Sequence, residues 1–234
     1  IINRENAQRR IVIQANVAER DLVGVVKKVQ AAIDTKVHLP QGYYVTYGGQ
    51  FESQATASRL IAVLSLFYLA GMFMVLFVHF KSANLALQVM VSIPLAFIGA
   101  VIGVWLSGGV FSIATMVGFV TLTGIAARNG IMMIAHYLHL MEHEGERFDI
   151  AMIYRGTSER IIPVLMTALT ASLALIPLII AADEPGREIL HPVAVVIFCG
   201  LFSSTLLDLT VRPLVFWKFG KKPVASLLPA AITH

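Results

Sequence analysis

The chain has 234 residues, of which 57% are hydrophobic and only 14% are charged. Soluble domains typically carry about 25% charged residues, so this composition predicts a membrane protein. The net charge of +4 is dispersed, without the basic and aromatic clusters that bind nucleic acid, so we expect no nucleic-acid partner. The single cysteine, Cys199, excludes a disulfide framework within the chain. The sequence contains no recognisable nucleophile–base pair or cofactor-binding loop, so we predict neither an enzyme nor a cofactor.

Residues 1–57 are the least apolar part of the chain and read as alternating strand and helix. "RRIVIQANV" (9–17) and "GYYVTYGG" (42–49) have the alternation and β-branched or aromatic content of strands. "DLVGVVKKVQAAID" (21–34) has helical spacing, with Asp21 as a suitable N-cap. Strand–helix–strand resembles half of a ferredoxin-like unit, so we predict a partial α+β segment whose partner strands lie outside the chain.

The remainder predicts an all-α membrane bundle over residues 58–219, followed by a tail at 220–234. A membrane-spanning helix needs about 20 apolar residues. Gly99 and Gly103 form a GxxxG pattern, which permits close helix contact. Five segments are long and apolar enough to span a membrane: 59–80, 85–106, 111–137, 161–181 and 190–218.

The distribution of Lys and Arg predicts the orientation of these spans. If residues 1–57 lie outside, the outer loops receive only Arg187. Cytoplasmic loops are enriched in Lys and Arg, so we expect residues 1–57 to be periplasmic and the carboxyl terminus to be cytoplasmic. The inner side then receives Lys81, Arg147, Arg155, Lys218, Lys221 and Lys222.

Arg128 lies deep within the third span, in "GIAARNGIMMIAHY" (124–137), and is followed by the polar Asn129. An arginine at the centre of a membrane helix costs about 2.5–3.5 kcal/mol on insertion scales, so it normally has a partner inside the protein. The only carboxylate in the five spans is Asp208, which is also placed to pair with Arg212 at i,i+4. Either Asp208 serves Arg128, or the partners of Arg128 lie in helices outside this chain.

Arg160 opens the fourth span, and Thr167 follows two helical turns later on the same face. An alternative is that Arg160 and Arg212 only extend their side chains toward the lipid headgroups.

Histidines and methionines at the inner end of the third span raise the question of a metal site. Imidazole suits Zn²⁺, and thioethers suit Cu(I). A solvated surface helix is the ordinary alternative for the histidines, and membrane packing is the ordinary alternative for the methionines, so we assign no metal site. The residues from which such a site would be built are His136, His139, His143, Met132 and Met133.

Five stretches together resemble the resistance-nodulation-division efflux permeases, and their sequences are most similar to those of the heavy-metal efflux branch. The resemblance runs in order from about Arg9 to Phe219. The stretches are "LPQGYYVTYGGQFESQ", "SIPLAFIGAVIGVWLSG", "VGFVTLTGIAARNGIMMIAHY", "RIIPVLMTAL" and "HPVAVVIFCGLFSSTLL".

The resemblance implies a twelve-helix permease of which this chain would supply a late porter segment (1–57) and helices eight to twelve. It also implies a missing amino-terminal part, a homotrimer in the bacterial inner membrane, and a periplasmic adaptor with an outer-membrane channel. The implied activity is export of heavy-metal cations by proton antiport. A drug-exporting permease is the alternative within the family, and a non-transporting sensor or scaffold is the alternative from another class.

The family's proton relay pairs acids of the fourth helix with a polar or basic residue of the tenth. By resemblance, Arg128 stands where many drug-exporting members have a lysine before Asn129, and Arg160 and Thr167 match relay-associated positions of the eleventh helix. Asp208 matches no family role that we can assign, and we include it as a membrane acid.

Overall fold

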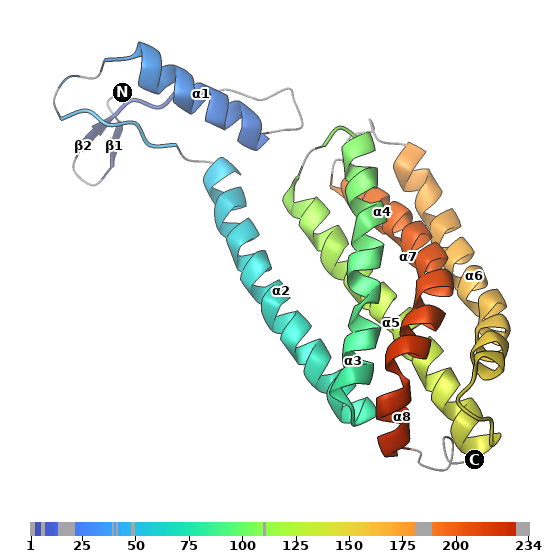
Figure 1. Ribbon diagram of the computed structural model, residues 1–234. Coiled ribbons are helices and arrows are strands. Elements are labelled where there is room, and N and C mark those ends of the chain that lie inside the picture. Colours follow the sequence, from blue (N-terminus) through green and yellow to red (C-terminus); the bar gives the residue numbers. More distant parts are fainter. Residues whose placement is uncertain are drawn as a thin grey trace. The chain divides into compact units, whose positions relative to one another are not determined.

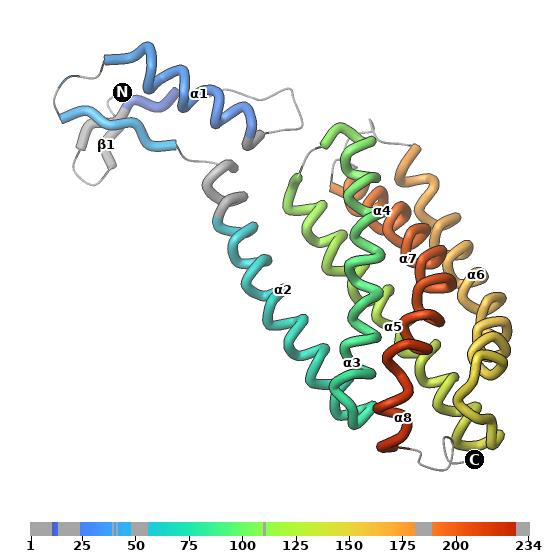
Figure 2. The backbone as a smooth tube through the Cα atoms, viewed as in Figure 1, coloured from blue at the N-terminus to red at the C-terminus, as the bar shows by residue number. Residues whose placement is uncertain are grey.

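The computed structural model describes residues 3–5, 8–13, 22–38, 40, 42–47, 50–109, 111–180 and 189–227. The chain divides into two compact units, Ile1–Ser53 and Gln54–His234, each of which is described by itself. Figure 1 labels the helices and strands, and Figure 2 traces the backbone of the same residues.

Before α2, the described residues of the first unit form a short hairpin and a helix. Strand β1 (Asn3–Glu5) pairs antiparallel with β2 (Gln8–Arg10), with Arg4 opposite Arg9. Helix α1 (Leu22–Lys36) forms where the helical spacing predicted a helix.

The predicted ferredoxin-like segment is wrong for the residues that the structure describes. Of the strand expected over 9–17, only the first two residues belong to β2, and Ile11 and Ile13 are almost fully exposed. Residues 43–47 form no strand, and residues 14–17 and 48–49 lie outside the described part. A strand needs partners for its backbone and a surface for its apolar face. Half a unit supplies neither, so its apolar residues stay exposed.

The second unit is a bundle of α-helices, as predicted. Within the described residues, five helical spans are long and apolar enough to cross a membrane by length and composition, which confirms that part of the prediction. The helices are α2 (Gln50–Phe80), α3 (Ala83–Met90), α4 (Ser92–Leu106), α5 (Ile113–His143), α6 (Ile150–Ile180), α7 (Leu190–Phe219) and the short α8 (Lys221–Leu227).

The second span is interrupted at Val91, between α3 and α4. Pro94 lies in the first turn of α4, and proline has no N–H and clashes with the carbonyl four residues earlier, which here belongs to Met90. The Val91 N–H turns back to the carbonyls of Leu87 and Val89 and closes α3. The interruption places Ser92 at the start of α4, where it is fully buried.

Side-chain caps fix where α5 and α6 begin. The Ser112 hydroxyl accepts from the Thr115 N–H (3.2 Å), and the Ser112 N–H donates to the Thr115 hydroxyl (3.3 Å), which forms a capping box for α5. The Asp149 carboxylate accepts from the Met152 N–H (2.8 Å). This cap starts α6 at Ile150, well before the apolar residues of its span.

Helix α7 lies against α3, α4, α5 and α6, and glycines allow the closest approach to it. A Cβ on Gly99 of α4 would overlap the Cys199 carbonyl and the Cβ of Ser203, and a Cβ on Gly103 would lie 2.7 Å from the Cys199 Sγ. The Ser203 hydroxyl crosses the interface and donates to the Leu95 carbonyl (3.0 Å). The GxxxG pattern is therefore the contact surface of α4 for α7.

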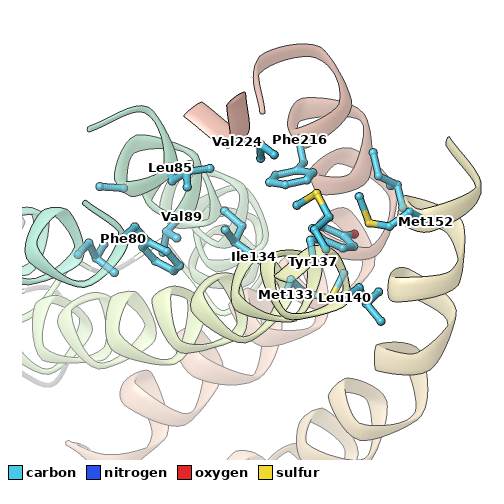
Figure 3. Packing of buried hydrophobic residues seen from close by; sticks show 14 residues of the cluster. Phe80, Leu85, Val89, Met133, Ile134, Tyr137, Leu140, Met152, Phe216 and Val224 are labelled. Carbon is cyan, nitrogen blue, oxygen red and sulfur yellow. The ribbon is translucent and has the colours of Figure 1, made fainter. Parts of the chain in front are cut away.

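A second packed region joins α2, α3, α5, α6, α7 and α8. Figure 3 shows Tyr137 of α5 between Phe216 of α7 and Met152 of α6, all of them fully buried. The Tyr137 and Phe216 rings are 4.8 Å apart between centroids, and the Tyr137 hydroxyl lies 2.7 Å from the Thr157 hydroxyl. A buried phenol requires such a partner, because an unpaired hydroxyl in an apolar interior is unfavourable.

The glycine contact predicts a position-specific loss of stability. Gly99→Ala should lower the unfolding free energy by about 1–3 kcal/mol, because the added methyl group overpacks the α4–α7 interface. Gly71→Ala is the matched control, since it is also a helical glycine but has nothing within 4 Å of its Cβ position. It should leave stability unchanged or raise it slightly. Thermal unfolding of the protein in detergent micelles measures both; equal midpoints for the two variants would contradict the close contact.

Candidate functional site

The candidate site consists of the charged and polar side chains carried by the membrane-capable helices. Three groups of them are described in turn. They are Arg128 on the surface of α5, an ion pair within α7, and a charged network between α5 and α6.

Arg128 is the central residue of α5 and points away from the interior of the described bundle. Its neighbours in sequence, Ala127 and Asn129, are 3% and 2% exposed, whereas Arg128 is exposed. Among the residues that the structure describes, Arg128 has no ion pair or hydrogen bond. Helix α5 therefore turns the amide inward and the guanidinium outward at the same level of the span.

Asp208 and Arg212 form the i,i+4 ion pair that their spacing predicted. The Arg212 Nη2 lies 2.6 Å from the Asp208 Oδ1, and both side chains are almost completely buried. The other carboxylate oxygen of Asp208 accepts from the Ser204 hydroxyl (3.0 Å). Asp208 therefore neutralises a cation on its own helix, and it makes no described contact with Arg128.

The Arg212 guanidinium also links α7 to two other spans. It donates to the Ser92 hydroxyl at the interruption between α3 and α4, and Ser92 in turn donates to the Val89 carbonyl (2.7 Å). A Cβ on Gly130 of α5 would lie 2.8 Å from the Arg212 Nη1, so only glycine leaves room for the guanidinium there. The Nε and Nη1 atoms of Arg212 are buried without a hydrogen-bond partner among the described residues.

A charged network closes the turn between α5 and α6. Arg155 donates to Glu144 (2.5 Å), Glu146 (2.7 Å) and Glu159 (2.9 Å). Glu159 also lies 2.8 Å from the Nε2 of His136 on α5. Glu144 and Glu146 directly follow the end of α5, whereas Glu159 lies on α6 one turn after Arg155, so one guanidinium joins the end of α5 to the first turns of α6.

Arg160 joins this network, whereas Thr167 does not. The half-buried Arg160 places its Nη2 3.4 Å from the His136 Nδ1. Thr167 is exposed, and its hydroxyl donates to the Val164 carbonyl of its own helix (2.9 Å). The described contacts therefore do not connect Arg160 to Arg128.

The histidines and methionines considered for a metal site do not converge. His136 uses its two ring nitrogens on Glu159 and Arg160, while His139 stacks on His143 with 4.5 Å between ring centroids. Met133 is part of the apolar core, and Met132 is half-buried. Within the described residues, no group of three or more His, Cys, Asp or Glu side chains is arranged to hold a metal ion.

Several polar residues of these clusters were not predicted from the sequence. Ser204 lies at i−4 from Asp208, and Glu159 lies at i+4 from Arg155, so helical spacing alone would have found both contacts. The contacts of Ser92 with Arg212 and of His136 with Glu159 join residues on different helices, and no local spacing indicates them.

The buried pair predicts a double-variant effect on stability. Asp208→Leu and Arg212→Met should each cost about 3–5 kcal/mol, because each leaves an unpaired charge in an apolar interior. The double variant should recover most of this loss, since it buries no charge. Arg155→Met, which breaks pairs on a side chain that is 44% exposed, is the control and should cost far less than either single variant, because solvent screens exposed ion pairs.

Chemical or thermal unfolding in detergent micelles measures all four variants. A double variant as unstable as the sum of the two single variants would show that Asp208 and Arg212 do not stabilise each other.

The chain matches a protein-family model and several known proteins. The model of the AcrB/AcrD/AcrF family matches residues 1–220. Protein HelA of Legionella pneumophila is 41% identical over 218 residues, which cover 93% of this chain and 20% of HelA. The cobalt-zinc-cadmium resistance protein CzcA of Cupriavidus metallidurans is 40% identical over 215 residues, which cover 92% of this chain and 20% of CzcA.

A solved structure agrees with these relatives. The crystal structure of a heavy metal efflux pump (crystal form II) superposes with a TM-score of 0.73 at 33% identity, covering 86% of this chain and 20% of that protein. The chain thus spans about a fifth of the length of the relatives that it matches. Because the family model covers nearly the whole sequence, the chain belongs to the AcrB/AcrD/AcrF family of resistance-nodulation-division permeases.

Proposed function

We propose that this chain is part of a proton-driven efflux permease of the bacterial inner membrane that exports heavy-metal cations by proton antiport. The names of its relatives support the substrate class, since they include cobalt-zinc-cadmium and nickel-cobalt resistance proteins and a heavy metal efflux pump. In this proposal, residues 1–57 belong to a periplasmic porter domain, residues 58–219 form membrane helices and residues 220–234 are a cytoplasmic tail. The rest of the permease, a homotrimer, a periplasmic adaptor and an outer-membrane channel complete the assembly.

The position of Arg128 is the observation that carries the proton-coupling part of the proposal. An exposed guanidinium at the centre of an apolar helix is unfavourable against lipid, so such a side chain normally faces protein or a water-filled cavity. We propose that membrane acids from another part of the permease meet Arg128. A nearby cation stabilises the ionised form of a carboxyl group, so protonation of those acids weakens the pairing and permits the helices to shift.

The other members of the proposed relay follow from the remaining polar positions of the spans. Asn129 faces inward from α5, Arg160 and Thr167 lie on α6, and Asp208 lies on α7. Asp208 is included because it is the one carboxylate within the five predicted spans, and its paired cation would be released when the carboxyl group takes up a proton.

A drug-exporting permease is the second candidate, and one observation favours it. The resemblance implies a lysine at the position of Arg128 in many drug exporters, so a basic residue there is a feature shared with that branch. Growth of a host lacking its own exporters separates the two. Protection by the full-length permease against cobalt, zinc or cadmium salts supports the metal-exporting branch, and protection only against lipophilic drugs supports the other. A sensor or scaffold would give neither.

The proton-coupling role of Arg128 is testable in the full-length permease reconstituted into liposomes. Arg128→Met should reduce both cation export and cation-dependent proton flux by at least about tenfold, which corresponds to losing roughly 1.4 kcal/mol of stabilisation in the rate-limiting step. Arg128→Lys, which retains the positive charge, should keep a measurable share of both fluxes. Arg59→Met is the control, because it removes an exposed arginine near the beginning of the first span.

Unchanged export and unchanged proton coupling in Arg128→Met would leave Arg128 with a structural role only. A loss of export that Arg59→Met reproduces equally would point to a general effect of removing positive charge.

The place of Asp208 in the relay needs a variant that separates function from stability. The double variant Asp208→Leu/Arg212→Met buries no unpaired charge, so it should fold, yet it has no carboxyl group to bind a proton. We expect its proton-coupled export to fall by at least about tenfold. Export at the wild-type rate would show that Asp208 serves only to neutralise Arg212.

A further inference from the structure

We propose that His136 positions Arg160 and releases it on taking up a proton, so that this histidine is a proton-binding residue at the α5–α6 end of the membrane domain. The proposal rests on the proton-antiport function proposed above, because it makes the contact of Arg160, a member of the proposed relay, depend on the protonation of His136. It concerns a residue outside the relay positions that the family resemblance implies.

The contacts of the imidazole define which nitrogen carries the proton. A guanidinium has only N–H donors, so the Arg160 Nη2 at 3.4 Å requires a lone pair on the His136 Nδ1. The remaining ring proton then lies on Nε2, which donates to the Glu159 carboxylate at 2.8 Å. These two contacts fit a neutral imidazole that lies between the Arg160 guanidinium and the Glu159 carboxylate of α6.

A second proton is incompatible with this arrangement. Protonation at Nδ1 turns the acceptor into a donor, so the N–H···N contact from Arg160 breaks and two positive charges face each other. The Glu159 contact is retained, because a carboxylate accepts equally well from a protonated imidazole. Loss of the same proton restores the lone pair and the Arg160 contact, so the cycle returns every group to its initial state.

Arg160 makes only weak contact with His136, so little free energy is needed to break that contact. Its contact with His136 is long for a hydrogen bond, and its Nε is buried without a partner among the described residues. A guanidinium held in this way has more to gain from a new partner than one that is fully paired.

The charged groups around His136 come from the helices that pack against α5. Histidine is the side chain that ordinarily changes charge between about pH 5 and 8. Helices α3 and α4, which pack on α5, contain no titratable residue. On α7, Asp208 is paired with Arg212, and the other titratable residues are His191, Cys199 and Lys218. On α6 the neighbouring charges are Glu159 and Arg160, and the charged groups beyond them are Arg155, Glu144 and Glu146.

His139 provides a matched control one turn further along α5. It is exposed and stacks on His143, away from the contacts with Glu159 and Arg160. His136→Gln removes the titrating ring, and His139→Gln removes an equivalent ring without touching Arg160.

The transport experiment uses the full-length permease in liposomes, with Zn²⁺ as the exported cation, and varies the pH on the side where α5 ends and α6 begins. With the pH difference across the membrane held constant, we expect the wild-type export rate to change between pH 5.5 and 8.0 by a factor at least about twofold larger than that of His136→Gln. His139→Gln should follow the wild type. A His136→Gln profile that matches the wild type would overturn the proposal.

A spectroscopic experiment tests the same inference without relying on transport. In full-length permease with ¹⁵N-labelled histidine, the resonances missing from His136→Gln identify this ring. At high pH they should show a proton on Nε2 alone, and at low pH on both nitrogens. A proton on Nδ1 at high pH would overturn the assignment. If the wild type exports no cation at all, the proposed function fails while this experiment still decides the role of His136.

Discussion

A polar group placed in the apolar interior of a membrane must find its partner within the protein, and this constraint arranges the charged residues of the chain. Arg212 illustrates it most directly. Its guanidinium is paired with Asp208 on its own helix, donates to Ser92 on another and lies against Gly130 on a third. A single ion pair therefore ties α7 to the interruption of the second span and to the middle of α5.

The same helix also packs closely against the glycines of α4. Gly99 and Gly103 bring α4 against Cys199 and Ser203 of α7 without intervening side chains. Lipid tails are as apolar as leucine side chains, so helices in a membrane associate through such close packing and through hydrogen bonds between helices. Both kinds of contact converge on α7, which is why substitutions there and at the α4 glycines should be the most disruptive.

Sequence reasoning succeeded where structure is local and failed where it depends on distant partners. Apolar length predicted the five spans, and helical spacing predicted the Asp208–Arg212 pair, because a helix satisfies its backbone within a few residues. The strands expected over 9–17 and 42–49 did not form a ferredoxin-like unit, since strands require partners from elsewhere. The contacts of His136 with Glu159 and of Arg212 with Ser92 could not be predicted either. They join different helices, and the sequence alone does not determine how each helix is rotated about its own axis.

The contrast between Arg128 and Arg212 bears on where the rest of the permease lies. Both are arginines within apolar helices, but Arg212 is buried with a carboxylate on its own helix, whereas Arg128 is exposed between two buried neighbours. The chain spans about a fifth of the length of the relatives that it matches. Because an unpaired guanidinium against lipid is unfavourable, we infer that the Arg128 face of α5 is covered by protein. In the function proposed above, the acids that meet Arg128 would lie on the protein surface that covers this face.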